Sequence, residues 1–193
     1  MRTIKTYSKR APFYNAFTRT YGEKLKFIDT YLLCIQSVFV TVMANQLEEI
    51  FARLHGTADF ADADFSDLNV TSSDGDNALH CVARWGDLAA AKALINAGID
   101  VNKAGDLGYT PLHVVCLQGN AEMVKLLIDS GADVFALSEG DAPFATARLG
   151  GHDDICDMLA PLMEEAQKRD PNVWVRARIA QLRREIASLE AKL

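Results

Sequence analysis

The chain has 193 residues, and 49% of them are hydrophobic, which is ordinary for a globular protein with a folded core. Its formal charge of -6 conceals three unlike segments, with 7 Lys/Arg and 2 Asp/Glu in residues 1–43, 8 and 22 in residues 44–170, and 5 and 2 in residues 171–193. The acidic middle segment excludes nucleic acid as a partner, because binding to phosphates depends mainly on Lys and Arg. A basic protein is the expected partner.

Residues 1–43 combine a basic stretch with an apolar run over residues 31–43. A signal peptide would have a much shorter basic region before its apolar core. A membrane span would be longer and less polar than residues 30–47, so we do not expect one. We favour the third reading, in which translation starts at Met43 and the protein is cytoplasmic. Membrane association or export stays the alternative if the extension is expressed.

A repeated frame begins after residue 71. Residues 72–104 contain His80, Gly86 and Gly98, and residues 105–136 contain His113, Gly119 and Gly131, each 33 positions later. Apolar residues at helical spacing follow both the histidine and the first glycine, which predicts two helices per repeat. The second helix of the first repeat carries alanines at 90, 91 and 93, which indicates either tighter helix packing or a weaker layer.

Two atypical copies flank this pair. Residues 137–168 continue the frame with Gly151, but Met163-Glu-Glu stands where a second glycine is expected, so we predict that the last helix runs on. Upstream, Asp67-Leu-Asn69 precedes Asp100-Val-Asn102 by 33 residues, which identifies residues 44–71 as a degenerate capping repeat. Terminal repeats differ from internal ones because one face meets water.

The run from Gly108 to Phe135, with its TPLH opening, central Gly119 and closing GADV, resembles the ankyrin signature. The resemblance covers about residues 44–168. It implies an all-α fold, an ankyrin-repeat solenoid of helix-turn-helix units, and a role in binding other proteins. It also implies that the histidine of the TPLH motif is structural, bonded to backbone and to the threonine hydroxyl between neighbouring repeats.

No motif in the chain predicts catalysis. The sequence has no Gly-rich phosphate loop, no Ser or Cys nucleophile signature and no HExxH motif. Cys34, Cys81, Cys116 and Cys156 form neither a CxxC pair nor a zinc-ligand spacing with histidine, so we expect free thiols. We therefore expect no enzyme activity, no cofactor and no metal.

In ankyrin proteins the partner usually contacts the turn tips and the exposed face of the first helix of each repeat. The resemblance places these positions on residues that are mainly acidic or aromatic, with Trp85 and Tyr109 as candidate hot spots. Trp85 has the alternative role of covering the capping repeat. An acidic face of this kind favours an adaptor or inhibitor of a basic protein, such as an immunity protein that masks a toxin. The predicted contact residues are Asp74, Asp76, Arg84, Trp85, Asp106, Leu107, Tyr109, Leu117, Gln118, Glu139, Asp141 and Leu149.

Residues 169–193 form a separate predicted helix. Its apolar residues alternate at spacings of 4 and 3, which is the stripe of a short coiled coil. Two arrangements follow. The helix either pairs chains in a homodimer through residues 171–193, which would make the protein a structural oligomer, or folds back as a cap over the exposed apolar side of the third repeat, in its own chain or in its neighbour in a dimer. Trp174 suits both. The stripe consists of Val175, Ile179, Leu182, Ile186, Leu189 and Leu193.

Overall fold

The computed structural model describes residues 45–191, so residues 1–43 and their three readings lie outside the described residues. The described part is all helical, as predicted, and contains no strand. A helix over residues 45–55 precedes three helix pairs: α3 (Ala78–Trp85) with α4 (Leu88–Ala97), α5 (Pro111–Gln118) with α6 (Ala121–Asp129), and α7 (Pro143–Gly150) with α8 (Asp153–Arg169). Short 3-10 turns lie at Ala58–Phe60 (η2) and Asp106–Gly108 (η3).

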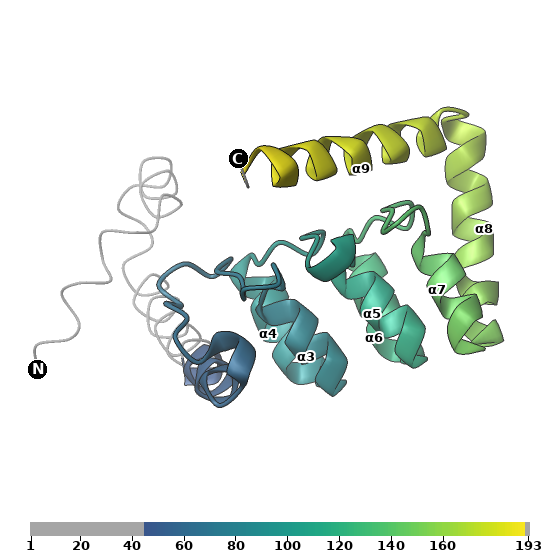
Figure 1. Ribbon diagram of the computed structural model, residues 1–193. Helices are drawn as coiled ribbons and strands as arrows, with labels where there is room; N and C mark the ends of the chain where they lie inside the picture. The colour runs from purple at the N-terminus through teal and green to yellow at the C-terminus, as the bar shows by residue number, and fades with distance from the viewer. Residues whose placement is uncertain (1–44, 192–193) are drawn as a thin grey trace, which may run out of the picture. The chain divides into compact units, whose positions relative to one another are not determined.

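The pairs stack side by side in two layers (Figure 1). The first helices α3, α5 and α7 contact one another in sequence, and so do the second helices α4, α6 and α8. Each pair alone would leave an apolar face in water, and stacking buries it. The resulting core is continuous from Leu54 in the first helix to Leu159 in α8, both of which are fully buried.

Helix ends are fixed by short polar side chains and by glycine. The carboxylate of Asp87 accepts a hydrogen bond from the backbone of Ala90 (3.0 Å), and the side chain of Asn120 does the same for Met123 (3.0 Å). Gly119 ends α5 in the left-handed conformation (φ 81°), which most side chains avoid. A Cβ there would also lie 2.3 Å from the ring of His152. These caps fix where α4 and α6 begin and where α5 ends.

Asparagines at the 33-residue spacing tie each turn to the next. The side-chain oxygen of Asn69 accepts from the N–H of Asp100 (2.8 Å), and that of Asn102 accepts from the N–H of Asp133 (2.7 Å). Asn102 also donates to the carbonyl of Gly131 (2.9 Å). The next position in this register is Phe135, which cannot continue the series.

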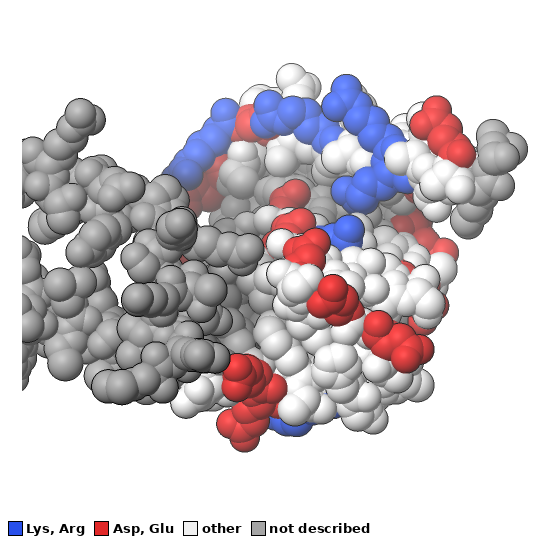
Figure 2. Space-filling model, turned by 90° about the vertical axis from the view of Figure 1, so that its left-hand side faces the viewer, with Lys and Arg blue, Asp and Glu red and all other residues white. Residues whose placement is uncertain are grey.

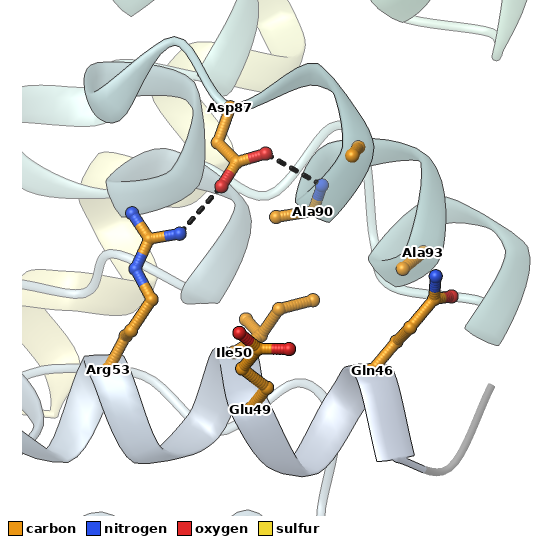
Figure 3. Close-up of a pocket in the computed structure, with 8 residues that line it drawn as sticks. Gln46, Glu49, Ile50, Arg53, Asp87, Ala90 and Ala93 are labelled. Carbon is orange, nitrogen blue, oxygen red and sulfur yellow. Dashed lines mark hydrogen bonds and ion pairs between the residues drawn. The ribbon is translucent and has the colours of Figure 1, made fainter. Parts of the chain in front are cut away.

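Ala90 and Ala93 of the first repeat are buried but border a depression. Ala90, Ala93 and their neighbours line an open depression of about 210 Å³ against Ile50 and Arg53 of the first helix (Figure 3). Leu127 and Met123 of α6 are fully buried in the next layer.

The last helix of the repeats runs on, as predicted, to Arg169. After a short turn, α9 (Val173–Glu190) folds back across the turn end of the repeats (Figure 1). It contacts the turn before α7 instead of the helical face of the third repeat. The ring of Trp174 meets Phe135 edge to face (4.9 Å between centroids), and Arg184 donates to the carbonyl of Leu137 (2.9 Å).

Candidate partner-binding surface

The turn tips of the second and third repeats have an uncommon backbone. Leu107 and Glu139, each just before a glycine with positive φ, both have φ of 51°. Side chains other than Asn, Asp and Gly rarely adopt this left-handed conformation. The hydroxyl of Ser138 donates to the carbonyl of Leu107 (2.8 Å), so the third tip supports the second. The Leu107 side chain is 60% exposed. Leu107 is thus an exposed apolar side chain on a turn backbone that favours glycine or asparagine.

Four of the five predicted tip carboxylates are exposed, namely Asp74, Asp106, Glu139 and Asp141. Figure 2 shows acidic side chains on the body of the molecule, below a rim of basic side chains. In Figure 1 the upper rim is formed by α9, which carries Arg176, Arg178, Arg183 and Arg184. The acidic turn tips therefore lie beside a basic helix of the same chain, α9.

Asp76 is the exception among the acidic tips, because it is buried and its carboxylate is already bonded. One oxygen accepts from the backbone N–H of Asp106 (3.1 Å), and the other accepts from Arg84 (3.1 Å). A Cβ added to Gly105 would lie only 1.9 Å from the same carboxylate. Asp76 thus joins the first tip to the second, and we leave it out of the proposed contact surface.

The exposed face of the first helices forms a second row. Arg84, Leu117 and Leu149 occupy corresponding positions of α3, α5 and α7. Leu117 is 41% exposed and Leu149 is 78% exposed. Gln118 is exposed too, but its amide donates to the carbonyl of Arg84 (3.1 Å) and joins neighbouring repeats.

Trp85 is half-buried and packs against the core. The guanidinium of Arg53, on the first helix, lies 4.3 Å from the centre of its ring. Arg53 also pairs with the carboxylate of Asp87 at 2.6 Å (Figure 3). This geometry matches the alternative role for Trp85, in which it covers the capping repeat. Arg53 and Asp87 were not among the predicted contact residues, because neither lies in a sequence motif.

Tyr109 is half-buried, and its ring lies 5.4 Å from that of His113. Its backbone carbonyl is the acceptor for His80, whose Nε2 lies 3.0 Å away. Tyr109 therefore supports the turn as well as bordering the exposed tip.

The depression beside Arg53 is a poor site for a small molecule. Its volume of about 210 Å³ is below the roughly 300–1,000 Å³ of ligand pockets, and it is open to solvent. Four of its eight lining residues, Gln46, Glu49, Arg53 and Asp87, are polar, but Arg53 and Asp87 are already paired with each other (2.6 Å). It belongs to the joint between the capping helix and α4.

The two repeated histidines are structural groups. His113 is fully buried, accepts a hydrogen bond from the N–H of Thr110 at Nδ1 (3.1 Å), and lies 3.2 Å through Nε2 from the carbonyl of Asp141. His80 makes the corresponding bonds with Asn77 and Tyr109. Both rings thus join one repeat to the next. Burial lowers the pKa of His113 to about 4 and also lowers that of His80.

Two buried cysteines are unreactive for the same physical reason. Burial raises the pKa of the Cys81 thiol to about 11 and that of Cys116 to about 12, so neither forms the thiolate needed for a nucleophile. Cys156 is the third free thiol among the described residues. Between residues 45 and 191, no helix is long and apolar enough to cross a bilayer.

The stacked helix pairs, the turn tips and the structural histidines define a repeat protein whose exposed face suits macromolecular binding. The family model for ankyrin repeats in three copies matches residues 38–138 and 103–172. The chain belongs to the ankyrin-repeat family, whose members are generally protein–protein interaction modules. No curated protein matches the sequence.

Proposed function

We propose that the protein is a non-catalytic adaptor or inhibitor that binds a basic protein through its turn tips and first-helix face. The observation that carries this proposal is the tip of the second repeat, where Leu107 is exposed beside Asp106 in a strained backbone. An exposed apolar side chain next to an acidic one suits a partner surface with a small apolar pocket and a basic rim. The proposed contact set is Asp74, Arg84, Asp106, Leu107, Tyr109, Leu117, Glu139, Asp141 and Leu149.

The acidic tips also support the charge of the partner. Arg184 of the same chain already places a guanidinium on the carbonyl of Leu137, next to the third tip. A basic partner would find comparable acceptors and carboxylates at the first two tips. Neutralisation of a basic protein toxin, by covering its active face, is the most specific form of this proposal.

The test compares two pairs of charge reversals. Asp106→Lys with Glu139→Lys alters the tips, whereas Glu122→Lys with Asp129→Lys makes the same charge change on exposed positions of α6. We expect the unmodified chain and the α6 variant to capture the same basic protein from native lysate. The tip variant should bind that purified protein at least tenfold more weakly by calorimetry. Equal binding by both variants, or an acidic partner, would contradict the proposal.

Leu107→Asn provides a second, independent variant. Asparagine tolerates the left-handed backbone better than leucine, so the free energy of unfolding should stay unchanged or rise. Affinity for the captured protein should nevertheless fall, because the exposed apolar contact is lost. A loss of affinity together with a loss of stability would indicate that Leu107 matters only for the fold.

Self-association is a second candidate function, favoured by the exposed stripe of α9. Val175, Ile179, Leu182, Ile186 and Leu189 are all exposed, although α9 is docked on the repeats. We propose that this stripe forms a homodimer. Sedimentation of the full chain should show a mass that rises with concentration, and Ile186→Glu should abolish the rise because it places a charge in the apolar seam. A constant monomer mass would count against this function.

A further inference from the structure

The helix α9 has two faces with different partners. Ala177 and Gln181 are its buried residues, and Arg184, on the same side, bonds to the carbonyl of Leu137. The apolar stripe lies about half a helical turn away, because Ile179 is two residues from both Ala177 and Gln181. Its members are between 41% and 64% exposed. Packing on the repeats and pairing with another chain therefore use opposite faces, so the two arrangements are compatible.

We infer that the occupant of this stripe is α9 of a second copy, running antiparallel. This inference rests on the proposed self-association and adds its direction. Both directions bury the same five apolar residues, so burial of the stripe does not decide between them. The charged residues on each side of the stripe distinguish the parallel from the antiparallel direction.

A parallel pair is disfavoured by four like-charge contacts. In a parallel coiled coil, the residues just before Ile179 and Ile186, which are Arg178 and Glu185, each face the residue five positions later on the other chain. Arg178 would then face Arg183 of the second copy, and Glu185 would face Glu190 of the second copy. Twofold symmetry doubles each contact. Like charges at such positions destabilise a helix pair.

An antiparallel pair gains attractive contacts that the parallel pair lacks. With Ile186 packed against Leu182 of the second copy, Arg176 faces Glu190 of the second copy, and symmetry provides this opposite-charge contact twice. Arg183 and Glu185 each meet their own equivalent once, near the twofold axis. Among the described residues, two attractive contacts thus stand against two repulsive ones. Continuing the register to Lys192, outside the described residues, adds its like-charge contact with Arg178 twice, so the antiparallel pair has two attractive and four repulsive contacts, whereas the parallel pair has four repulsive contacts and no attractive one.

The structure leaves the residues of this test available. Arg183 and Glu190 are exposed and make no hydrogen bond with other described residues, and Glu185 accepts only from Gln181 of the same helix (2.8 Å). Arg176 pairs with Asp170, just before α9, and its guanidinium keeps further N–H donors for Glu190 of the second copy. The change at Glu190 therefore leaves the packing of α9 on the repeats unaltered. The change at Glu185 removes the acceptor of the buried Gln181 amide, so thermal unfolding must show that this variant is folded like the unmodified chain.

Glu190→Arg in the full chain tests the direction, because the two arrangements predict opposite signs. In the antiparallel pair it turns both Arg176 contacts repulsive, and the dimer dissociation constant should rise about tenfold at low salt. In a parallel pair it would place an arginine opposite Glu185 and tighten the dimer.

Glu185→Arg is the matched control, with the same change of charge on the same helix. It should leave the antiparallel dissociation constant nearly unchanged, because a like pair stays a like pair. Tightening by either variant in sedimentation experiments would overturn the antiparallel inference while preserving self-association. A chain that stays monomeric up to about 100 µM would overturn both the inference and the self-association on which it rests.

Discussion

Replacement of His113 by alanine should lower the free energy of unfolding by roughly 3–5 kcal/mol, the largest effect expected of any single change outside the apolar core. The ring is fully buried and bonds Thr110 in its own repeat and Asp141 in the next. Alanine leaves a buried N–H and a buried carbonyl without these partners and opens a cavity. Urea unfolding followed by circular dichroism measures the change.

The control for His113→Ala is His55→Ala. His55 is exposed, and its one hydrogen bond, to the carbonyl of Ala61, is long at 3.3 Å. We expect that variant to cost less than about 1 kcal/mol. If the two variants had similar stability, the assigned role of His113 in joining repeats would be wrong.

Acidification should weaken the fold well above the range where carboxylates titrate. The pKa of His113 is about 4 in the folded chain and near 6.5 in the unfolded chain, so between these values the unfolded chain binds more protons. The stability contributed by the neutral ring is complete above pH 6.5 and is lost progressively as the pH falls to about 4. The loss is roughly 3 kcal/mol for His113, and His80 acts in the same direction.

Urea midpoints at pH 7.5, 6.5, 5.5 and 4.5 would measure this dependence. His113→Ala should flatten the curve between pH 6.5 and 4.5, because only His80 then contributes a lowered histidine pKa. A curve that is flat in the unmodified chain would show that the buried rings are protonated without cost, in conflict with their contacts.

The repeats could be predicted from the sequence because their signals are local and recur at a fixed spacing. The run from Thr110 to Gly119 specifies a cap, a helix and a left-handed stop, and the structure follows it. The 33-residue spacing of Asn69 and Asn102 is visible in the sequence. In the structure, both side chains accept the hydrogen bonds that join neighbouring turns. The run-on of α8 also followed from one missing glycine.

The predicted contact surface was less predictable, because a side chain's availability depends on residues far along the chain. Trp85 is covered by Arg53, which is 32 positions earlier, and Asp76 is held by the backbone of Asp106, which is 30 positions later. No local sequence pattern predicts either contact. The placement of α9 was open for a similar reason, since its stripe alone does not reveal that Ala177 and Gln181 face the repeats.

Phe135 has a consequence for the growth of the array. Repeat arrays whose end repeats expose their stacking faces can associate head to tail. Such contacts do not close into a ring, so they lead to filaments. Here the position that carries asparagine in the two preceding turns is aromatic and lies against Trp174, so it offers no acceptor to an incoming turn. The outer end of α8 adds exposed ion pairs, including Lys168 with Glu164. We therefore expect the third repeat to end the array, so that a second molecule does not stack on it.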